Sequence, residues 1–265
     1  MEKNLMYATF FIMGVVLFPV KMIVEFVNPQ IVHSIWFISI YALSLFVMMV
    51  VSAKSKAMKE GAPVPKNQLL SFLSFLCVPG CAWGAYAYFL SEKPKDLKVQ
   101  YTMLSVFCAI SALFFAYVCY AHISGKNPFK NLQMLLFAPP IMYLFSISVF
   151  FSYEIGKHDP YNLLFKSLAL LFFVYYPQNY VEFSDIGHKR KRMITFGLPS
   201  ALISFGYFFS HMSKISLCSN FGVLDCASGI MHALISIYVL GFLLVGPLKN
   251  VGSQSLAEAR VGDVS

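Results

Sequence analysis

Residues 99–122 read VQYTMLSVFCAISALFFAYVCYAH, a stretch of 24 residues that contains no Asp, Glu, Lys or Arg. A bilayer core about 30 Å thick is crossed by about 20 apolar residues in an α-helix, because each residue adds about 1.5 Å of rise. The stretch therefore has the length and the composition of one transmembrane helix. We expect the rest of the chain to be built from similar segments.

Apolar stretches of this kind occur on both sides of residues 99–122. Eight segments in all are long and apolar enough to cross a bilayer, and together they take up more than two thirds of the 265 residues. They are Leu5 to Val27, Ile31 to Ser52, Gln68 to Leu90, Val99 to His122, Leu132 to Tyr153, Tyr161 to Glu182, Met193 to Ser213 and Val223 to Leu248. Because only three residues separate the first two segments, seven helices are the alternative count.

The predicted fold is all-α, a polytopic membrane helix bundle. We expect one transmembrane domain over residues 1–250, followed by a short polar cytoplasmic tail over residues 251–265. The composition agrees, since 58% of the residues are hydrophobic and 12% are charged, against about 25% charged in a typical soluble domain. So few charges cannot form the polar surface that a soluble protein of this size requires.

The distribution of Lys and Arg predicts the orientation in the membrane. If the N-terminus is inside, thirteen of the 20 Lys and Arg residues fall in inner segments and five in outer loops. Positive charge is retained on the cytoplasmic side, so we expect both termini to be cytoplasmic. The net charge of +8 then reports orientation and not a nucleic-acid partner. We expect a multi-pass protein of the plasma or inner membrane.

A dense basic run lies just inside the predicted membrane, where Lys189, Arg190, Lys191 and Arg192 follow one another. The run is expected to set the topology. Attraction to anionic lipid headgroups is the alternative role, because such clusters bind anionic membrane surfaces.

Ionisable residues inside the apolar segments are the candidate site residues. A charged side chain in hydrocarbon costs a few kcal/mol even on the mildest scales, so such residues usually face the bundle interior and mark a site. Most of them fall near the predicted outer ends of their segments. We expect a polar cavity that opens to the outer face and binds substrate through Lys21, Glu25, Lys166, His211, Asp225 and His232.

Two of the segments carry polar stripes at helical spacing. One consists of Asp225, Ser228, Gly229, His232 and Ser236, and the other of Ser200, Ser204, Tyr207 and His211. If the stripes face each other, they line a cavity between the two helices. The alternative is that they form interhelical hydrogen bonds, with His232 as a hydrogen-bonded core histidine.

Neither the cysteines nor any known catalytic motif points to a particular reaction. Cys77, Cys81 and Cys108 lie inside apolar segments and are expected to pack. Whether Cys218 and Cys226 form a disulfide across the last outer loop stays open. The sequence has no G-x-S-x-G, H-E-x-x-H, phosphate-loop or G-x-G-x-x-G motif. We nominate no catalytic residue, metal or cofactor.

The leading hypothesis is a small-solute or ion permease. In a proton-coupled version, His232 or Asp225 would be the group that changes charge. The first alternative is a membrane-embedded enzyme that acts on a lipid or isoprenoid substrate, with His232, Asp225 and His158-Asp159 at the outer face as general acid and base. The second is an accessory or sensory subunit that docks a cytoplasmic partner. Substrate and oligomeric state do not follow from the sequence.

Overall fold

The computed structural model describes residues 66–91, 95–153, 160–179, 192–204 and 223–245, with isolated helical positions at 20, 24, 43, 46, 47 and 50. This part of the chain is all-α, as expected, and contains six helices. They are α5 (Gln68–Leu90), α6 (Lys98–Ser124), α7 (Ala138–Tyr153), α8 (Pro160–Tyr175), a helical segment over residues 192–204, and α10 (Val223–Val245). The predicted segments over residues 5–27 and 31–52 lie outside the described ranges, so the count of eight stays a prediction.

Three helices are long and apolar enough to cross a membrane. They cover Gln68–Leu90, Lys98–Ser124 and Ala227–Val245. Two shorter apolar helical stretches cover Gln133–Val149 and Asn162–Tyr175. Several apolar helices in one chain indicate a multi-pass membrane protein in contact with lipid.

The ends of α5 and α6 have local causes. The side chain of Asn67 caps α5, since its Oδ1 accepts a hydrogen bond from the Leu70 amide at 3.1 Å. α6 ends at Ser124 and is capped by Gly125, which has a left-handed φ of 71° and donates its amide to the Ala121 carbonyl at 2.8 Å. The bounds of α5 coincide with the predicted segment, and those of α6 are wider by one residue at the start and two at the end.

Prolines shorten the next two helices. The predicted segment over residues 132–153 starts as a 3₁₀ turn (Gln133–Phe137), and the α-helix begins only at Ala138. Pro139 and Pro140 then lie in its first turn, where a missing amide breaks no helical hydrogen bond. α8 ends at Tyr175 because Pro177 disfavours the α conformation of the residue before it, and a 3₁₀ turn (Tyr176–Asn179) follows.

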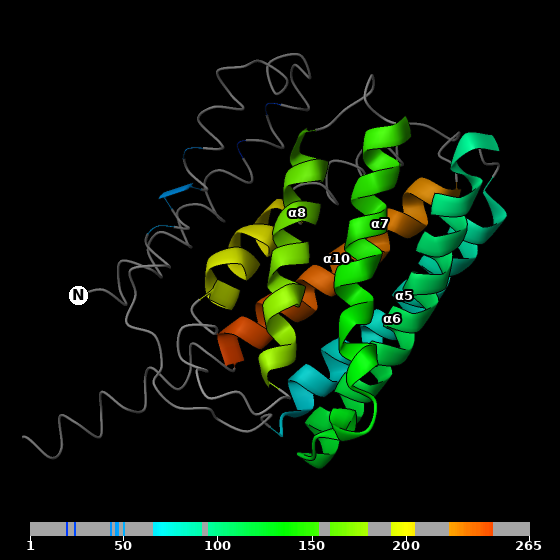
Figure 1. The fold of residues 1–265 in the computed structure, drawn as a ribbon. Helices are drawn as coiled ribbons and strands as arrows, with labels where there is room; N and C mark the ends of the chain where they lie inside the picture. The colour runs from blue at the N-terminus through cyan, green and yellow to red at the C-terminus, as the bar shows by residue number, and fades with distance from the viewer. Residues whose placement is uncertain are drawn as a thin grey trace, which may run out of the picture.

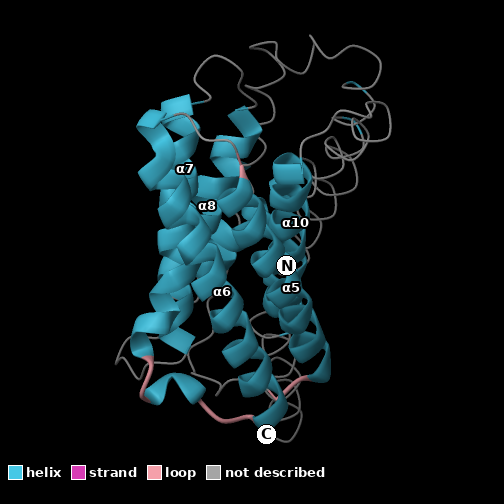
Figure 2. Cartoon of the chain, turned by 90° about the vertical axis from the view of Figure 1, so that its right-hand side faces the viewer, coloured by secondary structure: helices cyan, strands magenta, loops and turns pink. Residues whose placement is uncertain are grey.

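In Figure 1, α7 and α8 stand upright and α10 crosses behind them at an incline; Figure 2 shows the same helices turned by 90°. Each of α5 to α8 packs on the next along the chain, and α10 returns to pack on α5. Ring contacts also join α10 to α6 and α8. Between residues 227 and 245 only Leu244 is exposed. A helix that is apolar and buried on nearly every side forms the centre of a bundle.

Glycines allow α5 and α10 to approach closely. A Cβ on Gly80 would lie 2.8 Å from Leu234 Cδ1, and a Cβ on Gly84 would lie 2.7 Å from Met231 Sδ. Small residues permit such contacts where no hydrophobic effect drives helices together. The Gly80-x-x-x-Gly84 spacing in the sequence is therefore a packing feature.

Candidate functional site

His232 lies at the centre of the bundle and is almost completely buried. Its Nδ1 is 3.4 Å from the hydroxyl of Tyr143 on α7, which is a long hydrogen bond. The Phe165 ring of α8 stands edge-on to the imidazole, with 5.1 Å between the ring centroids. Since His232 follows Val223 by nine residues, it lies about 14 Å from the start of α10. That depth places the imidazole in the interior of a bilayer.

Lys166 is brought to the same place by α8. It directly follows Phe165, whose ring contacts the imidazole of His232, and it is 7% exposed. The structure therefore brings together two of the residues that the sequence nominates. Asn162, one turn earlier on α8, is also buried, so polar side chains continue along this face toward the start of the helix.

Two serines bond to the backbone at His232. Ser204, from residues 192–204, donates its hydroxyl to the His232 carbonyl oxygen at 3.2 Å. Ser236, one turn further along α10, donates to the same oxygen at 2.8 Å. The two predicted stripes therefore meet here, through an interhelical hydrogen bond. We call Tyr143, Lys166, Ser204, His232 and Ser236 the central polar group.

Two buried polar atoms near this group make no hydrogen bond within the described part of the chain. One is Nε2 of His232, and the other is Oγ of Ser146, which lies one turn from Tyr143 on α7. Either tautomer of His232 leaves Nε2 with a donor or an acceptor to satisfy. A buried polar atom without a partner costs about 1–3 kcal/mol, so Nε2 is a place where a solute that supplies a hydrogen-bond partner would be bound favourably.

A second set of buried polar side chains lies closer to the other end of α10. The Tyr238 hydroxyl is hydrogen-bonded to the Tyr176 hydroxyl and lies 3.3 Å from Nε2 of His122. We call His122, Tyr176 and Tyr238 the inner polar group. Sequence reasoning did not nominate it, because tyrosines are common in this chain and nothing in their spacing separates hydrogen-bonded ones from those that face lipid.

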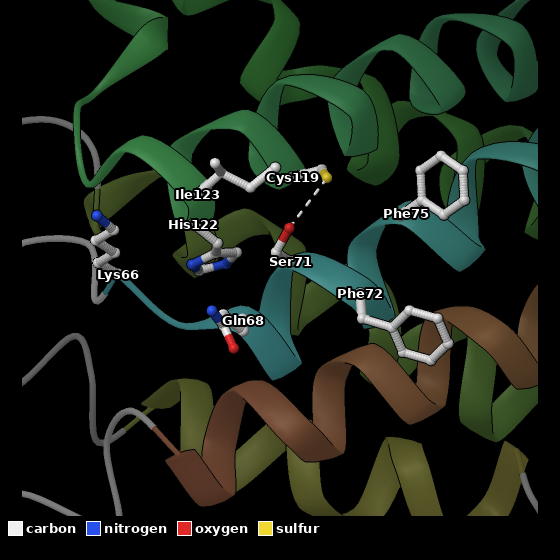
Figure 3. Close-up of a pocket in the computed structure, with 8 residues that line it drawn as sticks. All are labelled: Lys66, Gln68, Ser71, Phe72, Phe75, Cys119, His122 and Ile123. Atoms are coloured by element: carbon white, nitrogen blue, oxygen red, sulfur yellow. Dashed lines mark hydrogen bonds between the residues drawn. The ribbon is translucent and has the colours of Figure 1, made fainter.

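A pocket of about 530 Å³ opens where α5 begins and α6 ends (Figure 3). Its residues include polar Lys66, Gln68 and Ser71, with Phe72 and Phe75 further along α5. We call it the inner pocket, because the positive-charge count predicts that these helix ends face the cytoplasm. It thus lies at the end opposite to the predicted outer opening, and His122 of the inner polar group is one of its lining residues.

The remaining nominated residues are placed as follows. Asp225 lies in the first turn of α10, and its side chain is outside the described part, as is that of Cys226. The described ranges also exclude Lys21, Glu25, His211, Cys218, Lys189, Arg190 and Lys191. Arg192 is exposed; its Nη1 donates to the Tyr175 hydroxyl at 3.1 Å, and its guanidinium carbon lies 5.4 Å from the centre of that ring. Cys77, Cys81 and Cys108 are buried free thiols, which agrees with a packing role.

Comparisons with protein families, with curated proteins and with solved structures found no match to this chain. Any function must therefore be argued from the side chains described above.

Proposed function

We propose that this protein is a multi-pass membrane permease for a small solute or an ion, and that the central polar group is its binding site. The observation that carries the proposal is Nε2 of His232, a buried polar atom at mid-membrane depth without a hydrogen bond to any described residue. Intramembrane ionisable residues most often mark transport pathways. Lys166 at the same site adds a second ionisable side chain to the binding group.

The arrangement suits a binding site between helices. Side chains from α7, α8, residues 192–204 and α10 meet at His232. A movement of any one of these helices would change the contacts of the imidazole. Histidine also changes charge near physiological pH when it is accessible to water, so coupling to protons is the version of the mechanism that we favour.

The direction of opening is also part of the proposal. Lys166 and Asn162 follow the start of α8, which is predicted to face outward, and we propose that the site opens on that side. Asp225 and His211, nominated from the sequence, would then lie on the route to His232.

The test is uptake by purified full-length protein in proteoliposomes. Proton movement is followed with a pH-sensitive dye inside the vesicles, first under a potassium-diffusion potential and then with mixtures of amino acids, sugars, carboxylates and organic cations added outside. We expect flux above that of empty vesicles, and we expect Lys166→Met to remove it. The matched control is Lys98→Met, which removes an exposed charge at the start of α6.

Two results would contradict the proposal. One is flux in the Lys166→Met protein equal to that of the unchanged protein. The other is a bound lipid that native mass spectrometry shows to be chemically altered over time while no solute or proton moves. The second result would favour the membrane-embedded enzyme.

A further inference from the structure

The inner pocket lies between the first turns of α5 and the last turns of α6, away from the central polar group. Figure 3 shows Lys66 and Gln68 at one end of it and the two phenylalanines, Phe72 and Phe75, at the other. On the wall between them, the Ser71 hydroxyl and the Cys119 sulfur are hydrogen-bonded at 3.3 Å. The volume of about 530 Å³ is in the usual range for ligand pockets.

One side of the inner pocket is apolar and faces outward. Phe72, Phe75 and Ile123 line the pocket, and their side chains are 57%, 58% and 56% exposed. They lie on α5 and α6, both of which are long and apolar enough to cross a membrane. In a bilayer these exposed rings and methyl groups contact acyl chains, so the pocket is continuous with the lipid.

The other side of the inner pocket is cationic. Lys66 lines it, and a Cβ built on Gly125 would lie 3.6 Å from Lys66 Cβ. The exposed Lys126 follows Gly125 directly, so the backbone of a second lysine lies close to Lys66. No Asp or Glu is among the described residues that line the pocket.

At the mouth of the inner pocket, the start of α5 offers backbone hydrogen-bond donors. The first amides of α5 have no acceptor inside the helix, and Asn67 Oδ1 is already used by Leu70. At the end of α6, the carbonyl of Ala121 accepts from Gly125 and that of His122 accepts from the Asn67 amide at 3.0 Å. Two of the last four carbonyls of α6 are therefore already paired.

We propose that the inner pocket binds one anionic phospholipid of the predicted inner leaflet. The phosphate would lie beside Lys66 and the start of α5, and an acyl chain would lie against Phe72 and Phe75. A soluble anion would use the cationic mouth but leave the lipid-facing aromatic wall without a role. The inference is independent of the proposed permease, because it uses none of the central polar group.

The test is native mass spectrometry of the full-length protein with dioleoylphosphatidylglycerol and, separately, with dioleoylphosphatidylcholine. We expect one phosphatidylglycerol to be retained preferentially. A lysine near an anionic surface contributes about 1 kcal/mol, so Lys66→Gln should weaken phosphatidylglycerol binding about fivefold. Phe72→Ala should weaken the binding of both lipids, because it removes part of the apolar wall.

Two variants serve as matched controls. Lys98→Gln removes an exposed lysine at the opposite end of α6, and Phe89→Ala removes an exposed ring at the opposite end of α5. Both should bind phosphatidylglycerol as the unchanged protein does. Thermal unfolding of all four variants identifies any loss of binding that is due to misfolding. If Lys66→Gln misfolds, Lys66→Arg keeps the charge and should still bind phosphatidylglycerol as the unchanged protein does.

Three results would overturn the proposal. The first is equal retention of phosphatidylglycerol and phosphatidylcholine. The second is a loss with Lys66→Gln no larger than the loss with Lys98→Gln. The third is complete displacement of phosphatidylglycerol by millimolar inorganic phosphate, which would identify the pocket as a site for a soluble anion.

Discussion

At the residue scale, Tyr238 is the side chain on which the inner polar group depends. Its hydroxyl is shared between Tyr176 of the turn after α8 and His122 of α6. The same ring stands edge-on to Phe115 and lies beside Phe242. One hydroxyl thus links three segments that are far apart in the sequence, within a core that is otherwise aromatic.

Tyr238→Phe should lower the stability of the bundle by about 1–3 kcal/mol. The change keeps the ring contacts but removes two hydrogen bonds, and bonds between membrane helices average about 0.6 kcal/mol with a maximum near 1.7. His122 and Tyr176 also lose a buried partner. The measurement is thermal unfolding in detergent. Tyr120→Phe, on an exposed position of α6, is the control, and an equal melting temperature for the two variants would show that the network contributes nothing.

At the element scale, close contact between helices depends on glycine at a few positions. Gly197, in residues 192–204, is the most crowded against a rigid group, since a Cβ there would lie 2.7 Å from Phe172 Cδ2 and 2.8 Å from Leu243 Cδ1. Gly229 on α10 has no atom within 4 Å of the same position. Close packing therefore requires a glycine at position 197 but not at position 229.

Gly197→Ala should destabilise the protein, and Gly229→Ala should not. The first change forces the buried Phe172 ring or the helix itself to shift, and overpacking of this kind costs about 1–3 kcal/mol. The second places a better helix former in open space, which should leave stability unchanged or raise it by up to about 1 kcal/mol. Thermal unfolding of the two proteins checks this; a larger loss with Gly229→Ala would mean that the helix contacts are placed wrongly.

The sequence predicts a helix end well where a local capping residue sets it, and less well where no local signal does. α5 and α6 follow from apolar length and end near the predicted residues, because Asn67 and Gly125 are local capping signals. α7 begins later than predicted because the chain is apolar on both sides of Pro139 and hydropathy does not register where the α-helix starts. Lys166 and His232 come from different helices, so their depth could be read from the sequence but their proximity could not.

The same distinction between local signals and long-range contacts applies to the candidate site. The polar stripe of α10 and the charge of Lys166 stand out in the sequence because they interrupt apolar helices. Tyr143, the side chain that contacts His232 from α7, does not stand out, because an aromatic residue in an apolar segment is equally suited to a lipid-facing position. The inner pocket depends on two helix ends meeting, which no spacing along the chain reports.

At the scale of the whole molecule, the distribution of Lys and Arg predicts which side of the membrane each helix end faces. α6 is 27 residues long, which corresponds to about 40 Å, so its two ends lie on opposite sides of a bilayer. Exposed Lys98 marks the predicted outer end, and exposed Lys126 follows the predicted inner end.

Cysteine labelling in sealed, right-side-out membranes checks the orientation. In a background with Cys218 and Cys226 changed to Ser, a membrane-impermeant maleimide should label Lys98→Cys from outside and Lys126→Cys only after the membrane is opened. The positive-inside count is the reason. The reverse pattern would place the inner pocket in the outer leaflet and would exchange the two sides of the proposed pathway.

The central claim is that His232 serves solute or proton movement and is more than a contact between helices. It is tested by His232→Gln with flux and melting temperature measured on the same preparation. Among the described residues the imidazole makes one long hydrogen bond, worth about 0.6 kcal/mol, so the melting temperature should fall by only about 2 °C. We predict that flux nevertheless falls to the level of empty vesicles, whereas a folded His232→Gln protein with unchanged flux would contradict the account.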